Sequence, residues 1–172
     1  MKFSFSWKTV LWEILKLTLL LFIVANVVSY LRKPQLVDKT LPDLTITTID
    51  GKQHALHNNA SKPTVLYFWG SWCPVCKMSS PVIDDLAKSY RVITFAVNSG
   101  SDEDIKSYMQ QHNLHFPVVN DADGAVAQKL GVDTFPTLFI YNARGTNTFT
   151  DVGYTSSLSL RLKLFLSRFI NQ

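Results

Sequence analysis

The chain contains only two cysteines, Cys73 and Cys76, and two residues separate them. An apolar run at 64–69, typical of a buried β-strand, precedes them, and a helix-like segment at 77–90 follows. A dithiol at such a junction is placed for thiol–disulfide exchange, because the helix N-terminus favours the attacking thiolate. A purely structural disulfide is the alternative interpretation, but so short a loop restrains the unfolded chain little.

The two cysteines are predicted to have different roles. Cys73 is expected to be the attacking thiol, exposed at the turn, with its pKa lowered by the backbone N–H groups and dipole of the helix. Cys76 is expected to lie one turn into the helix, partly shielded, and to resolve the mixed disulfide. Pro74 and Val75 are expected to tune the reduction potential, since neither side chain ionises or donates a hydrogen bond. No cofactor other than the redox-active disulfide Cys73–Cys76 is expected.

The elements that must position the dithiol follow from the pattern of the remaining chain. Strands alternating with helices predict βαβ units with a parallel centre, and a terminal hairpin makes the sheet mixed, so the fold class is a three-layer α/β/α domain. Strands are expected at 44–49, 52–56, 64–69, 91–98, 116–119, 137–141 and 146–152, and helices at 77–90, 101–112, 125–130 and 156–170. The last helix is amphipathic, with these apolar residues on one side: Leu158, Leu162, Phe165, Leu166 and Phe169.

The N-terminal segment is predicted to be a membrane anchor. Residues 17–31 carry no charge, and the apolar character reaches back to Val10, which gives the length of about 20 residues that a bilayer span needs. Glu13 and Lys16 are expected to lie near one membrane face. A cleaved signal peptide is the alternative, with a weak cleavage site at 27–29. The expected organisation is a cytoplasmic tail and anchor helix at 1–33, a tether at 34–40 and a domain at 41–172.

The charge distribution argues against a nucleic-acid surface. Residues 1–39 contain six Lys and Arg against two Asp and Glu, whereas residues 40–172 contain eleven of each, so the net charge of +4 comes entirely from the N-terminal segment. No nucleic-acid partner is therefore expected. The four histidines, His54, His57, His112 and His115, form two pairs that no third ligand completes by spacing, and no metal site is predicted.

The residues around the dithiol resemble the thioredoxin superfamily. The resemblance is carried by the run Phe-Trp-Gly-Ser-Trp-Cys-Pro-Val-Cys-Lys at 68–77, by Pro81, and by Gly-Val-Asp-Thr-Phe-Pro-Thr at 131–137 before a strand. It covers residues 41–172. Together with the N-terminal hairpin and the anchor, the chain resembles membrane-tethered envelope thioredoxin-like proteins. That group includes cytochrome c maturation reductases and the suppressor-of-copper-sensitivity thioredoxin-like proteins, and the latter are the nearer match.

The resemblance implies further site residues. Pro136 matches the cis-proline that lies opposite the dithiol in this superfamily, and Phe135 before it would present its backbone to an extended substrate strand. Trp72 would shield the dithiol on one side. Tyr67 and Ser79 stand where two kinds of relative keep a carboxylate that moves protons to and from the second cysteine.

These observations predict a thiol–disulfide oxidoreductase on the periplasmic face of the bacterial inner membrane, held by a single span. The domain would exchange disulfides with cysteine-containing client proteins and with a membrane thiol-redox partner. The alternative from a different class is a copper-binding or copper-delivery module that uses the same two cysteines, with Met78 as a further soft ligand.

Overall fold

The computed structural model of the chain describes residues 7–31, 40–56 and 63–170. It divides into two units, Met1–Lys33 and Pro34–Gln172. The first unit contains one helix, α1 (Trp7–Leu31), of 25 residues. In α1 the ammonium group of Lys16 lies 2.9 Å from the carboxylate of Glu13, one turn away.

The predicted membrane span is not confirmed by the structure. A helix does form over residues 10–31, where the span is expected. However, among the residues that the structure describes, no helix is both long enough and apolar enough to cross a membrane.

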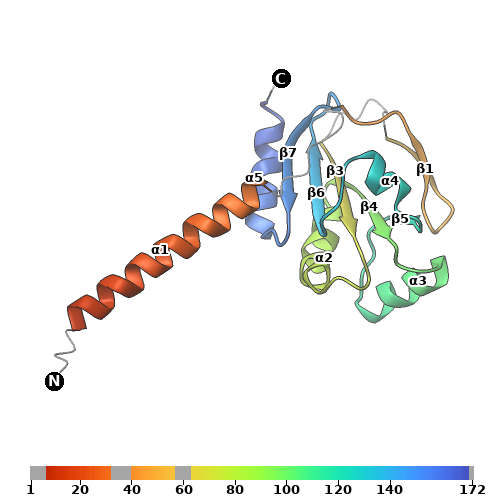
Figure 1. The fold of residues 1–172 in the computed structure, drawn as a ribbon. Helices are drawn as coiled ribbons and strands as arrows, with labels where there is room; N and C mark the ends of the chain where they lie inside the picture. The colour runs from red at the N-terminus through yellow and green to blue at the C-terminus, as the bar shows by residue number, and fades with distance from the viewer. Residues whose placement is uncertain (1–6, 32–39, 57–62, 171–172) are drawn as a thin grey trace. The chain divides into compact units, whose positions relative to one another are not determined.

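The second unit is built on a mixed sheet of five strands (Figure 1) in the order β5-β4-β3-β6-β7. The central strand β3 pairs in parallel with β4, and β4 pairs in parallel with β5, whereas β6 and β7 are antiparallel. The mixed sheet with a parallel centre and a terminal hairpin is therefore confirmed. The strands are β3 (Thr64–Trp69), β4 (Arg91–Val97), β5 (Val118–Asp121), β6 (Thr137–Tyr141) and β7 (Asn147–Val152).

An antiparallel hairpin and four helices complete the unit. The hairpin joins β1 (Thr45–Thr47) and β2 (Gln53–Ala55), inside the two segments predicted for it. The helices are α2 (Pro74–Ala87), α3 (Asp102–Gln111), α4 (Ala125–Lys129) and α5 (Ser157–Ser167). Ser101 and Asp104 form a capping box at the start of α3.

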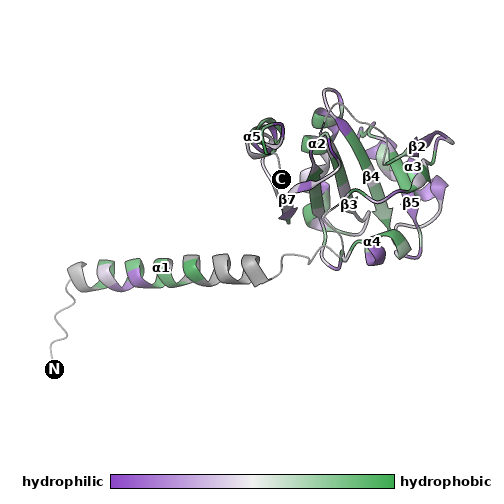
Figure 2. Ribbon diagram, turned by 90° about the horizontal axis from the view of Figure 1, so that it is seen from above, coloured by the Kyte–Doolittle hydropathy of each residue, from purple (hydrophilic) through white to green (hydrophobic). Residues whose placement is uncertain are grey.

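The core lies on both faces of the sheet, because successive side chains of a strand point to opposite sides. From β3, Tyr67 and Trp69 join one cluster with residues of α2, α3 and α5. Leu66 and Phe68 join the other, with residues of the hairpin and α4. Figure 2 shows strand β4 as largely hydrophobic. The resulting order is helices, sheet, then α4 with the hairpin.

One strand begins later than predicted. We expected a strand at 116–119, and β5 runs from Val118 to Asp121. The backbone N–H groups of His115 and Phe116 donate to the buried carboxylate of Asp84 in α2, so they do not enter the sheet ladder. The loop before β5 is thereby fixed to α2.

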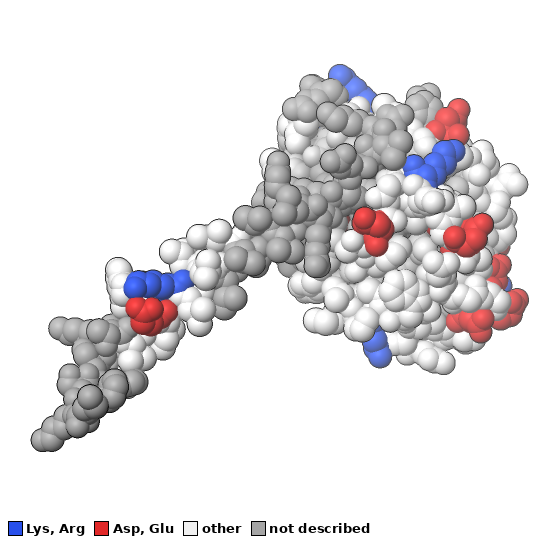
Figure 3. All heavy atoms as spheres, viewed as in Figure 1, with Lys and Arg blue, Asp and Glu red and all other residues white. Residues whose placement is uncertain are grey.

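The helix α5 has an unexpected orientation. It buries Leu160, Leu164 and Ser167, whereas its predicted apolar side faces outward. Four residues of α5 and one just beyond it are exposed: Leu158, Leu162, Phe165, Leu166 and Phe169. Figure 3 shows that the described Lys and Arg side chains on the drawn face of the domain lie singly and do not form a basic patch.

Candidate active site

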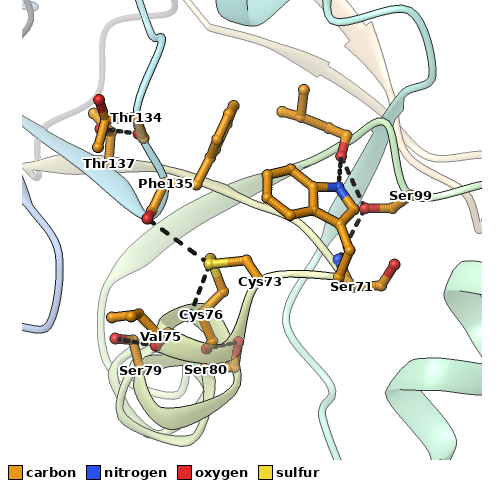
Figure 4. Close-up of a disulfide and its surroundings, with 12 residues drawn as sticks. Ser71, Cys73, Val75, Cys76, Ser79, Ser80, Ser99, Thr134, Phe135 and Thr137 are labelled. Atoms are coloured by element: carbon orange, nitrogen blue, oxygen red, sulfur yellow. Dashed lines mark hydrogen bonds between the residues drawn. A yellow bond between two sulfur atoms is a disulfide. The ribbon is translucent and has the colours of Figure 1, made fainter.

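The two cysteines form a disulfide at the N-terminus of α2, with their Cα atoms 5.2 Å apart. Cys73 is the N-cap residue, and Pro74 occupies the first helical position, where its missing N–H costs nothing. The backbone N–H of Cys76 donates to Sγ of Cys73 at 3.2 Å (Figure 4). After reduction the same N–H and the helix dipole favour a thiolate at Cys73 over one at Cys76.

Cys73 is more buried than predicted. We expected it to be exposed at the turn, yet only 5% of its surface is accessible, against 0% for Cys76. The reason is the loop before β6, which lies against the sulfur: the carbonyl oxygen of Phe135 is 3.8 Å from Sγ of Cys73 (Figure 4).

This loop contains the two residues that the resemblance assigned to substrate binding. The peptide bond between Phe135 and Pro136 is cis, as the resemblance implied. Thr137 holds the loop by donating from Oγ1 to the carbonyl oxygen of Thr134 at 2.7 Å, and the N–H of Gly153 donates to the carbonyl of Pro136. The structure thus brings Phe135, Pro136 and the disulfide together, while their part in binding a substrate stays a prediction.

Trp72 lies beside the dithiol with 55% of its surface exposed. Its indole N–H donates to the carbonyl of Val97 at 3.2 Å, and its ring meets that of Phe135 edge to face at 5.5 Å. The ring also passes so close to Gly70 that a Cβ there would lie 2.5 Å from the indole. Gly70 is therefore the residue that lets Trp72 adopt this position.

Ser99 and Ser80 are positioning residues that the sequence analysis missed. Ser99 Oγ accepts from the N–H of Ser71 at 3.0 Å and donates to the carbonyl of Val97, so it ties the turn before the dithiol to the end of β4. Ser80 donates to the carbonyl of Cys76 at 2.8 Å. Its position four residues after Cys76 was the available signal, since a helical serine often bonds to the carbonyl one turn back.

Hydroxyl groups occupy the two positions, 67 and 79, where two kinds of thioredoxin-like protein keep a proton-transferring carboxylate. Ser79 is buried and donates to the carbonyl of Val75. Tyr67 is buried in the same cluster as Cys76, and its hydroxyl makes no hydrogen bond with the described residues. Burial raises the pKa of Tyr67 far above its ordinary value, and the nearby hydroxyls of Ser80 and Ser79 offset this only in part. At neutral pH the phenol therefore stays protonated and cannot accept a proton from Cys76.

The histidines do not assemble a metal site within the described residues, where no group of three or more His, Cys, Asp and Glu side chains lies together. His112 stacks on the ring of Tyr108, and His115 lies 3.6 Å from Asp84. His57, from the predicted pairs, lies outside the described residues.

Comparison with known proteins agrees with this geometry. The model of the AhpC/TSA family matches residues 37–148. A thioredoxin-like protein of Haemophilus influenzae is 32% identical over 157 residues, which are 90% of this chain and 93% of that protein. The thiol-disulfide oxidoreductase ResA of Geobacillus thermodenitrificans is 31% identical over 113 residues, which are 63% of this chain and 65% of the ResA chain.

A solved structure supports the same assignment. The secreted Mycobacterium tuberculosis disulfide oxidoreductase homologous to E. coli DsbE superposes with a TM-score of 0.63 and 28% identity, covering 72% of this chain and 96% of its own. The match to the family model includes the segment that carries the Cys73–Cys76 disulfide. The chain therefore belongs to the AhpC/TSA family of thioredoxin-like proteins and is a thiol–disulfide oxidoreductase.

Proposed function

We propose that the domain exchanges disulfides with client proteins outside the cytoplasm, with Cys73 as the nucleophile and Cys76 as the resolving thiol. The observation that carries the proposal is the hydrogen bond from the N–H of Cys76 to Sγ of Cys73 at the start of α2. It favours the thiolate on the sulfur that also lies against the Phe135 loop, where a client would bind.

In the reducing direction the cycle runs in two steps. The thiolate of Cys73 attacks one sulfur of a client disulfide, and the other client sulfur leaves as a thiolate that takes up a proton. Cys76, deprotonated, then attacks Sγ of Cys73 and releases the second client cysteine as a thiol. The client gains two electrons and two protons, and the domain ends as the Cys73–Cys76 disulfide. A membrane thiol-redox partner would return two electrons; the oxidising direction is the reverse.

The client would bind along the loop that contains the cis peptide bond. The backbone of Phe135 borders Cys73, so an extended client segment can pair with it and place its own cysteine near Sγ. Trp72 would cover the mixed disulfide through its edge-to-face contact with Phe135. Pro74 and Val75, both exposed between the cysteines, are the positions where the reduction potential would be tuned.

A trapping experiment tests the roles of the two thiols. Cys76→Ala should accumulate a mixed disulfide with client proteins in cells, because nothing resolves it, whereas Cys73→Ala should trap none. Both variants should lose insulin reduction. Trapping by Cys73→Ala and not by Cys76→Ala would reverse the assignment. The equilibrium of the purified domain with glutathione then sets the direction: a potential near about −270 mV indicates a reductase and one near about −120 mV an oxidant.

We also propose that residues 1–33 are a cytoplasmic tail and anchor, residues 34–40 a tether, and residues 41–172 the catalytic domain facing the periplasm. Residues 17–31 carry no charge, and Arg32 and Lys33 follow directly. Glu13 pairs with Lys16, which lowers the cost of bringing both near a membrane face. Retention in the membrane after carbonate extraction, with digestion of the domain by protease in spheroplasts, is the expected result. Release of a shortened chain would identify a cleaved signal peptide instead.

Within the family, we propose that the chain belongs to the suppressor-of-copper-sensitivity group. The combination of an N-terminal apolar helix, an N-terminal hairpin and the Cys-Pro-Val-Cys dithiol supports this. Deletion of the gene should then lower the copper concentration that halts growth. Unchanged copper tolerance together with a defect in cytochrome c maturation would place the chain in the other group.

A further inference from the structure

Helix α5 carries apolar side chains on two opposite sides. One side, formed by Leu160 and Leu164, packs into the core with the strands and α2. The other is a stripe that we call the outer stripe: Leu158, Leu162, Phe165, Leu166 and Phe169. Because a helix turns about 100° per residue, these five positions fall within one side of the helix, opposite Leu160 and Leu164.

The outer stripe is not part of the domain's core. Its members are 40% to 79% exposed. Phe165 and Phe169 pack edge to face on each other, with ring centres 5.0 Å apart. Such a row exposes several hundred Å² of apolar surface, about the size of the largest patch on an ordinary monomer, and a patch of that size is often functional. Figure 1 shows α5 at the outside of the domain, beside β7.

Basic side chains border the outer stripe. Arg161 and Arg168 flank it on one side and Lys163 on the other, and the helix itself contains no acidic residue. Two acids of neighbouring elements already pair with α5: Asp85 with Arg161 at 2.8 Å and Asp151 with Lys163 at 2.6 Å. Arg168 is exposed and has no ion-pair partner among the described residues. The border of the stripe therefore keeps a net positive charge.

From this arrangement we infer that α5 docks the domain onto a membrane surface that contains anionic lipid. The outer stripe enters the boundary between headgroups and acyl chains, and the arginines stay at headgroup level, because their long side chains reach outward while their methylenes lie along the apolar surface. The positive charge favours an anionic membrane over other binding partners, because the exposed Arg168, unpaired in the part of the chain that the structure describes, can pair with phosphatidylglycerol headgroups. Since Leu160 and Leu164 stay in the core, the helix docks without unfolding.

Docking of this kind is separate from thiol exchange. The core cluster that contains Cys73 and Cys76, with the residues packed against it, includes no residue of the outer stripe. It is also separate from the proposed N-terminal anchor, because residues 34–172 contain both core clusters and α5. The solved relative from Mycobacterium tuberculosis matches 72% of this chain over 96% of its own length, so this unit corresponds to a fold that stands alone.

The test uses residues 34–172 and sedimentation with vesicles. Vesicles of phosphatidylethanolamine and phosphatidylglycerol should bind the domain, and binding should weaken as salt is raised. Leu162→Ser with Phe165→Ser should lower the partition coefficient at least about tenfold, from the apolar area withdrawn from the bilayer. The matched control, Leu162→Met with Phe165→Leu, keeps the apolar surface and should bind like the parent. Arg168→Gln should lose about fivefold on these vesicles, and vesicles of phosphatidylcholine alone should show no such loss.

Three results would overturn the inference. The first is no binding of the parent domain to the anionic vesicles. The second is equal binding by the serine and control variants. The third is a dimer of the parent domain in light scattering that the serine variant abolishes, since the stripe would then be an interface between two copies. Insulin reduction should be the same for parent, serine and control variants, so failure of this inference is distinguishable from failure of the proposed thiol exchange.

Discussion

Removal of the phenolic oxygen of Tyr67 is expected to stabilise the domain. The hydroxyl is buried beside the dithiol helix and makes no hydrogen bond with the described residues. An unpaired buried hydroxyl costs about 1–3 kcal/mol, and Tyr67→Phe removes it while keeping the ring. Because the nearby hydroxyls of Ser80 and Ser79 partly offset the effect of burial on the pKa of the phenol, we take the lower end. A gain of about 1 kcal/mol should raise Tm by about 3–4 °C for a domain of this size.

A matched substitution beside Tyr67, at Thr94 on the neighbouring strand β4, should lower the stability of the domain instead. Thr94 is fully buried, and its hydroxyl accepts from the indole N–H of Trp69 at 3.2 Å and donates to the carbonyl of Pro117 at 3.0 Å. Thr94→Val keeps the shape but leaves the indole N–H without its acceptor. The expected cost is about 1–3 kcal/mol, because the stranded donor bears its full desolvation penalty.

Urea and thermal unfolding of the oxidised domain measure both changes. A loss of stability in Tyr67→Phe of the same size as that in Thr94→Val would refute the reasoning, since the phenol would then be hydrogen-bonded in solution. The two variants share the chemical change, loss of one hydroxyl from the core, so a general softening of the core cannot produce opposite signs.

The pH dependence gives a second readout for Tyr67. Burial raises the pKa of the phenol, so the protonated form persists throughout the neutral range. The rate of thiol–disulfide exchange should therefore show the same dependence on pH in Tyr67→Phe as in the parent. A shift in the alkaline limb of that profile would mean that Tyr67 takes part in proton transfer with Cys76.

Further predictions concern the supports of the site. Asp84→Ala should cost about 2–4 kcal/mol in urea unfolding, because the N–H groups of His115 and Phe116 lose their shared acceptor. Gly70→Ala should force Trp72 from its place, seen as a red-shifted tryptophan emission and faster alkylation of the reduced Cys73. Hydrogen bonds from Ser101 hold the pKa of Asp104 below its ordinary value of 3.8, so the folded state gains stability above that pH and loses it as the pH falls through the lowered pKa. The difference in Tm between parent and Asp104→Ala should therefore shrink from about pH 5 to about pH 2.

Much of the fold was predictable because the strongest patterns are local. The apolar runs of β3 and β4 are buried along almost their whole length, and such runs bounded by polar turns leave few alternatives to a central parallel strand. The position of the dithiol at a strand–helix junction follows from the same runs. The capping box at Ser101 is likewise a local pattern, since its two partners are three residues apart.

Features that depend on distant contacts were not predictable from the sequence. The burial of Cys73 is set by the carbonyl of Phe135, which is far away along the chain. The late start of β5 is set by Asp84, whose side chain takes the backbone N–H groups that a strand would have used. Ser99 acts on the turn before the dithiol from the end of β4. In each case a polar group finds its partner only after the sheet and α2 have packed.

Helix α5 shows why an apolar pattern alone does not reveal which side of a helix is buried. Leucine recurs at every second position from 158 to 166, so successive leucines are turned by about 200° and alternate between opposite sides of the helix. Both sides are then apolar, and the larger set, with two phenylalanines, is the one left exposed. The smaller side, which contains Leu160, Leu164 and Ser167, is the one that is buried. A helix that served only the core would carry polar residues on its outer side, so the apolar outer side of α5 and Arg168 beside it, unpaired within the described ranges, agree with the membrane contact inferred above.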